Sequence, residues 1–118
     1  QTRLWIAVMI SVTVTSNLAL GWFTDLTWYV GLSGPLHGIL VLAALVSMKQ
    51  REPFAWLVVL IVFAKVGYEQ WAGPSTQLAN WIAADVAIES HLWGTVAGTL
   101  LAPIFWWFVP AAKTEQPD

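Results

Sequence analysis

The chain has 118 residues, of which 58% are hydrophobic and only 10% are charged, whereas roughly 25% of residues are charged in an average soluble domain. A chain this short cannot bury that much apolar surface in water. We therefore expect a single membrane domain, with room for about four spans of ~20 residues each. A net charge of -2 with five Lys+Arg excludes a basic nucleic-acid surface, and zero cysteines exclude disulfides, thiolate metal sites and a cysteine nucleophile.

Four apolar runs follow one another along the chain, separated by polar or turn-rich segments. They predict helices over about residues 4–23, 33–48, 54–71 and 86–109. The intervening segments contain Gly, Pro and charged residues, which is typical of loops. The expected fold class is therefore all-α: a polytopic transmembrane helix bundle in one domain, residues 1–112, with a polar cytoplasmic tail over 113–118.

The distribution of basic residues predicts how the bundle is oriented. Lys49 and Arg51 lie between the second and third runs, Arg3 precedes the first run and Lys113 follows the fourth. The two other connecting segments carry acidic residues but no Lys or Arg. By the positive-inside rule, both termini and the central loop are expected in the cytoplasm. The N-terminal ends of the second and fourth helices then share the outer side of the membrane.

Ser33 and His91 are the first candidates for chemistry, because each lies near the start of one of those two helices. A serine hydroxyl becomes a good nucleophile when a neighbouring imidazole takes its proton, and a histidine with an ordinary pKa near 6.5 can do so at neutral pH. The pair is a candidate Ser/His dyad. The alternative is that Ser33 only caps its helix, as serine commonly does.

Glycine pairs accompany both candidates. Gly34 and Gly38 lie four residues apart on the second helix, and Gly94 and Gly98 have the same spacing on the fourth. Small residues at this spacing let two helix backbones come into contact within lipid. The sequence therefore predicts close helix packing beside the dyad, although such glycines are also common in membrane bundles without catalytic activity.

Three further polar residues have possible supporting roles. His37 follows Ser33 by four residues on the same helix face and is an alternative base, although we favour His91 because a facing helix can approach the hydroxyl laterally. Lys65 and Glu69, also four residues apart, are expected to form a buried ion pair, or Lys65 acts as the general base in a Ser/Lys mechanism. The two histidines with a carboxylate lack an H-E-x-x-H spacing, so we expect no metal site.

Three sequence strings occur in order on the second, third and fourth helices. They are G-L-S-G-x-L-H-G at residues 31–38, K-x-x-Y-E-Q-x-x-G at residues 65–73 and H-L-x-G-x-x-x-G at residues 91–98. The first and last resemble the two catalytic segments of rhomboid intramembrane serine proteases. All three together are similar to the rhombosortase branch of that family.

The resemblance implies a six-helix rhomboid core whose last four helices correspond to the four helices expected here. It implies Ser33 as nucleophile and His91 as general base, with no third acidic member and no cofactor. Backbone groups at Gly31 and Gly34 are candidates for part of the oxyanion site. Rhomboids carry a His and an Asn for the oxyanion on their second helix, so we expect these 118 residues to be the C-terminal part of a longer protease.

The resemblance also implies a substrate class. Rhombosortases are thought to cleave exported bacterial proteins whose C-terminal signal contains a Gly-Gly motif, a membrane helix and a basic tail. The expected location is the bacterial inner membrane, with the site toward the outer face, and the expected partners are lipid and the transmembrane C-terminal segment of the substrate. The alternatives are a rhomboid-like module that binds transmembrane helices without cleaving them, an inactive fragment of a protease, or a transporter fragment.

Overall fold

The computed structural model describes residues 2–25, 32–73 and 88–110. Those residues form four helices: α1 (Thr2–Phe23), α2 (Ser33–Lys49), α3 (Ala55–Ala72) and α5 (Ile88–Phe108). The expected all-α class and the four expected helices are confirmed. Gly31, the start of the fourth expected helix at Val86 and the tail at residues 113–118 lie outside the described residues.

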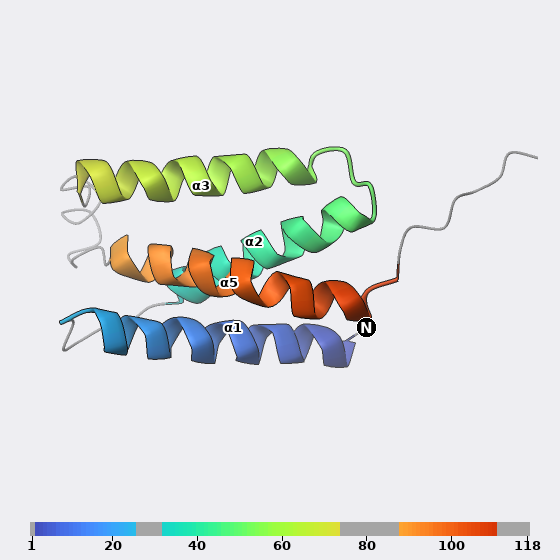
Figure 1. The fold of residues 1–118 in the computed structure, drawn as a ribbon, viewed down its shortest axis with the longest axis horizontal. Helices are drawn as coiled ribbons and strands as arrows, with labels where there is room; N and C mark the ends of the chain where they lie inside the picture. The colour runs from blue at the N-terminus through green and yellow to red at the C-terminus, as the bar shows by residue number, and fades with distance from the viewer. Residues whose placement is uncertain (1, 26–31, 74–87, 111–118) are drawn as a thin grey trace, which may run out of the picture.

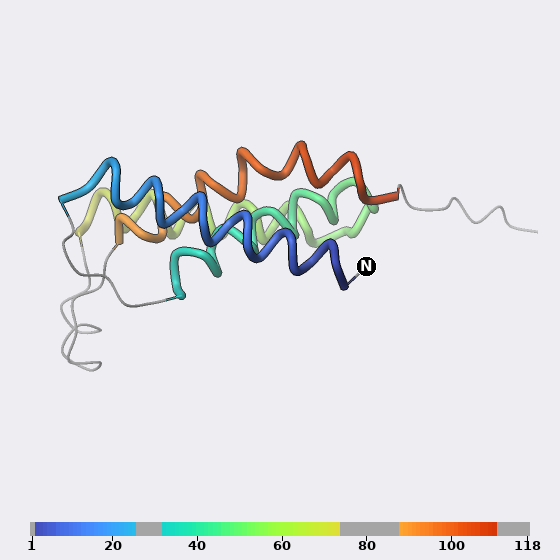
Figure 2. Tube along the Cα trace, turned by 90° about the horizontal axis from the view of Figure 1, so that it is seen from below, coloured from blue at the N-terminus to red at the C-terminus, as the bar shows by residue number. Residues whose placement is uncertain are grey.

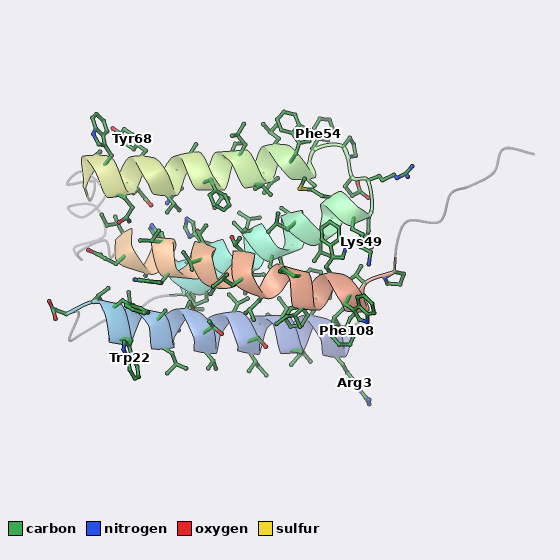
Figure 3. The ribbon with its side chains drawn as sticks, viewed as in Figure 1. Arg3, Trp22, Lys49, Phe54, Tyr68 and Phe108 are labelled. Carbon is green, nitrogen blue, oxygen red and sulfur yellow. The ribbon has the colours of Figure 1, made fainter. Side chains whose placement is uncertain are left out.

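The four helices lie side by side and alternate in direction along the chain (Figures 1 and 2). α2 and α5 cross in the centre of the bundle, with α1 on one side and α3 on the other. The N-terminal ends of α2 and α5 therefore lie at the same end of the bundle, which we call the Ser33 end. Figure 3 shows Trp22 and Tyr68 at this end, and Arg3, Lys49, Phe54 and Phe108 at the opposite, Lys49 end.

The core lies on both faces of α2. One cluster joins α2 to α3 through Val41, Val62 and Val66. The larger cluster joins α1, α2 and α5, and its buried members are Val8, Val12, Leu42, Val46, Ala102 and Phe105. Since a bilayer is itself apolar, van der Waals packing rather than the exclusion of water makes these contacts hold α2 between its neighbours.

Large apolar side chains cover the outside of the bundle. Trp22, Trp71 and Trp107 are exposed near helix ends, and Leu18 and Leu100 are exposed further from them. Among the described residues, α1 and α3 are long and apolar enough to cross a membrane, and α2 is an apolar helix of 17 residues. An apolar exterior with tryptophans near its margins is typical of a protein in a bilayer. The membrane assignment of α2 and α5 stays a prediction.

The C-terminal end of α2 forms a Schellman motif. The Arg51 N–H donates to the Met48 carbonyl and the Glu52 N–H donates to the Ser47 carbonyl, at 3.1 and 3.2 Å. Arg51 has a φ of 60°, in the left-handed region that glycine usually occupies at this position of the motif. Pro53 then follows, which cannot extend the helix.

Both ends of the α5 helix are tied to neighbouring helices. At the Lys49 end, the Lys49 ammonium donates to the Trp106 and Val109 carbonyls at 2.6 and 2.7 Å. A cation at a helix C-terminus satisfies carbonyls that lack helical partners and complements the helix dipole. At the Ser33 end, the rings of Phe23 and Trp93 stack with centroids 4.6 Å apart, which joins α1 to α5.

Candidate functional site

Ser33 is the first residue of α2. The residue at the N-cap position is Leu32, which makes no side-chain capping bond, and its carbonyl accepts the Leu36 N–H at 2.9 Å. Pro35 is tolerated in this first turn because helical N–H groups there have no intrahelical acceptor. The alternative in which Ser33 serves as the N-cap of its helix is therefore wrong, since Leu32 holds that position.

The first turns of α2 and α5 are in direct contact. A Cβ atom added to Gly34 would come within 2.6 Å of the Ser90 carbonyl oxygen and 3.1 Å of the Ser90 Cβ. Gly34 follows Ser33 in sequence, and Ser90 precedes His91. The contact therefore places the two candidate catalytic residues on adjoining turns of two facing helices.

The two glycine pairs form the next part of the same contact. A Cβ on Gly94 would overlap the Gly34 carbonyl oxygen, and a Cβ on Gly98 would overlap that of Gly38. A Cβ on Gly38 would in turn meet the Gly94 carbonyl. The structure thus brings the four glycines that the sequence singled out against one another, backbone to backbone, as small-xxx-small spacing allows.

His37 links the two helices at the level of this contact. Its Nδ1 lies 2.6 Å from the Ser33 carbonyl oxygen, and its ring stacks on that of His91 with centroids 4.2 Å apart. Because a carbonyl oxygen can only accept, Nδ1 of His37 is the protonated, donating nitrogen. His37 therefore connects the main chain of Ser33 to the His91 ring.

Lys65 and Glu69 form the ion pair that their spacing predicts, with Lys65 Nζ 2.6 Å from Glu69 Oε1. The expectation that this pair is buried is wrong, because the two side chains are 44% and 19% exposed. Lys65 is a hydrogen-bond donor in this pair, whereas a general base has to accept a proton. The Lys65 side chain is also 44% exposed in the helix bundle, so the desolvation that a lysine base requires is not observed. This geometry favours His91 over Lys65 as the base.

The second oxygen of Glu69 makes a contact that the sequence reasoning missed. Glu69 Oε2 lies 2.9 Å from His91 Nδ1. The resemblance implied a two-residue site without an acidic member, but the structure places a carboxylate on the proposed base. The sequence held one indication of this contact. Because the helices alternate in direction, the end of α3 that carries Glu69 lies beside the start of α5, which carries His91.

The site residues thus divide by location. The structure brings His37, Lys65, Glu69 and His91 into one cluster at the Ser33 end. Ser33 and the glycine contact border this cluster, whereas Gly31 lies outside the described residues. Within residues 2–25, 32–73 and 88–110, no three His, Cys, Asp or Glu side chains are arranged as metal ligands.

An apolar groove of about 280 Å³ lies between α3 and α5. Its walls include Phe63, Gly67, Gln70, Leu92 and Thr95. Gln70 and Leu92 directly follow Glu69 and His91, so the groove begins beside the polar cluster. The Gln70 amide donates to the Ile88 carbonyl at 3.2 Å, which holds this end of α3 against the first turn of α5.

The family model described as the rhomboid domain matches residues 1–108. No curated protein and no solved structure matches the chain significantly.

Proposed function

The chain belongs to the rhomboid family, and on that premise we propose that it is an intramembrane serine protease domain with Ser33 as nucleophile and His91 as general base. The observation that carries the proposal is the contact between the first turns of α2 and α5, where Gly34 meets Ser90. Two helices that approach backbone to backbone let a hydroxyl on one reach an imidazole on the other.

The proposed reaction is peptide-bond hydrolysis in two steps. Ser33 Oγ attacks the scissile carbonyl carbon while His91 Nε2 takes the hydroxyl proton, and His91 then gives this proton to the leaving amine. Water then attacks the acyl carbon and loses a proton to His91, which gives this proton to Ser33 Oγ as the acyl–oxygen bond breaks and the acid product leaves. The reaction requires no metal or cofactor, because the serine and histidine carry out each proton transfer.

The start of α2 supports charge stabilisation in this reaction. Gly34 lies in the first turn, at the positive end of the helix dipole, where main-chain N–H groups favour a developing oxyanion. We include Gly31 and Gly34 as backbone contributors, together with the His and Asn that rhomboids carry on their second helix. Each oxyanion donor is commonly worth about 3 kcal/mol in the transition state.

The substrate we propose is the C-terminal sorting signal of an exported bacterial protein, containing a Gly-Gly motif, a membrane helix and a basic tail. The three strings at residues 31–38, 65–73 and 91–98 support this rhombosortase assignment. Arg3 and Lys49 lie at the opposite end of the bundle, and Arg51 comes two residues after Lys49, the last residue of α2. These basic residues support a cytoplasmic Lys49 end. The Ser33 end then faces outward from the inner membrane.

The proposal is tested by co-expression in bacterial membranes. A reporter with the Gly-Gly, helix and basic-tail terminus is expressed with the natural gene product containing these residues, and mass spectrometry locates any new C-terminus. We expect cleavage near the Gly-Gly motif, its loss in Ser33→Ala and in His91→Ala, and acylation of Ser33 by a serine-directed inhibitor. Unchanged cleavage in either variant, with all proteins inserted at equal levels, contradicts the assignment.

The second candidate is a rhomboid relative that binds transmembrane helices without cleaving them. The apolar groove between α3 and α5 favours it, since such a surface binds apolar segments whether or not chemistry follows. The co-expression assay with the reporter distinguishes cleavage from binding alone. Capture of the uncut reporter by crosslinking, without acylation of Ser33 in the natural gene product, supports the binding module.

A further inference from the structure

The carboxylate of Glu69 bridges two side chains from different helices. Oε1 lies 2.6 Å from Lys65 Nζ on the same helix, and Oε2 lies 2.9 Å from His91 Nδ1 on α5. The exposed fractions of the Glu69 and His91 side chains are 19% and 9%. The Glu69–His91 bond is therefore largely shielded, and hydrogen bonds gain strength where water is excluded.

The donor and acceptor roles in this cluster follow from its chemistry. An ionised carboxylate only accepts hydrogen bonds, so His91 Nδ1 bears a proton and donates it to Glu69. Lys65 Nζ also lies 3.3 Å from His91 Nδ1. Two donors do not bond to each other, so the shorter carboxylate contact decides the tautomer. A neutral imidazole has one N–H, which leaves His91 Nε2 as its acceptor nitrogen.

A second helix restrains the same ring. His37 stacks on His91 from α2 while Glu69 bonds its edge from α3. A stacked face fixes the plane of the ring, and a bond at Nδ1 fixes its rotation within that plane. His91 is therefore held in one orientation by two helices other than its own.

We propose that Glu69 is a positioning residue of the reaction: it holds His91 in the tautomer whose Nε2 accepts the Ser33 proton and stabilises the imidazolium that forms. The proton on Nδ1 stays on His91 throughout, and Glu69 is not protonated. Lys65 orients Glu69 by occupying its other oxygen. This inference rests on the proposed protease function and extends its two-residue site to three residues.

The tautomer of His91 is measured independently of activity. These 118 residues contain two histidines, so selective ¹⁵N labelling of histidine gives two sets of ring signals from them, which are assigned by their loss in His37→Phe and in His91→Phe. In the wild-type protein in bilayers we expect both rings to be protonated at Nδ1. In Glu69→Gln, His91 should lose this pattern because an amide also offers a donor to Nδ1, while His37 keeps it. An unchanged His91 tautomer overturns the proposal.

Kinetics then measure the consequence. We expect Glu69→Gln in the natural gene product to lower kcat by about 10²- to 10⁴-fold with KM changed less than about threefold, as an acidic residue behind a catalytic histidine does. Glu52→Gln, the same substitution in the exposed segment between α2 and α3, is the control and should keep wild-type kinetics. Equal kcat for Glu69→Gln and wild type overturns the proposal.

A double variant separates positioning from simple charge balance. If Glu69 only neutralises Lys65, removing both charges in Lys65→Met/Glu69→Gln restores the wild-type rate, which overturns the proposal. If Glu69 acts on His91, the double variant stays as slow as Glu69→Gln. Failure of the underlying function looks different: wild-type protein then neither cleaves the reporter nor is acylated at Ser33, while the tautomer measurement still decides the role of Glu69.

Discussion

The imidazole rings of His37 and His91 lie face to face, with their planes inclined by 23°. One ring comes from the helix that begins with Ser33 and the other from the helix that faces it. His37 also bonds the Ser33 main chain through Nδ1. Of the two histidines, His37 thus bonds the backbone of the proposed nucleophile, which agrees with the proposal of His91 as the base.

This division of roles predicts the result of His37→Phe. Phenylalanine keeps an aromatic ring against His91 and removes only the bond to the Ser33 carbonyl, worth about 1 kcal/mol. We expect reporter cleavage to fall by less than about tenfold, whereas His91→Phe should abolish it. Complete loss of cleavage in a folded His37→Phe protein would instead identify His37 as the base.

The glycine contact between α2 and α5 predicts that one added methyl group lowers both stability and activity. In Gly94→Ala the new Cβ would overlap the Gly34 carbonyl oxygen, so α2 and α5 must separate. We expect the free energy of unfolding to fall by about 1–3 kcal/mol and cleavage to be lost. The measurement is helicity by circular dichroism during titration with a denaturing detergent.

Gly21→Ala and Gly67→Ala are matched controls for that substitution. A Cβ at either position meets nothing within 4 Å. Alanine also favours a helix over glycine by up to about 1 kcal/mol. Both variants should be at least as stable as wild type, and a Gly94→Ala protein as stable as they are would rule out the tight α2–α5 contact.

The turn after α2 predicts a stabilising substitution. Arg51 has a φ of 60°, where a side chain costs roughly 1–2 kcal/mol and glycine does not. Because glycine also loses more backbone entropy on folding, we expect Arg51→Gly to raise the free energy of unfolding by about 0.5–1 kcal/mol. Gln50→Gly, at a φ of -82°, should lower it. If both variants shift the unfolding midpoint in the same direction, the left-handed backbone at Arg51 does not destabilise the protein as argued.

Much of this arrangement could be predicted because it depends on helix direction and spacing. Four apolar runs joined by short segments alternate in direction, and this alone puts the starts of α2 and α5 at one end. The i,i+4 spacing of Lys65 and Glu69 was likewise sufficient to predict their ion pair, since residues four apart on a helix are neighbours.

The Glu69–His91 contact and the conformation of Arg51 could not be predicted, because they depend on how α3 is rotated about its axis and on backbone angles. α3 is apolar around most of its circumference, so the sequence does not indicate which side faces α5 or that Glu69 reaches His91. The ion pair with Lys65 that the sequence predicts already neutralises the Glu69 carboxylate, so the sequence offered no reason to expect His91 as a further partner. Arg51 shows a similar limit: no glycine marks the left-handed position, and only the backbone bonds of the Schellman motif identify it.

The main-chain contact between α2 and α5 also limits how the bundle can move. At the glycine contact no side chains lie between the two backbones, so no change of rotamer can compensate for a small change in the distance between α2 and α5. The two helices can therefore only slide along each other or separate. Lys49 further restricts sliding by holding two carbonyls near the far end of α5. For the proposed substrate peptide, we therefore expect room at the Ser33 end to come from a displacement of α1 or α3 rather than from a separation of α2 and α5.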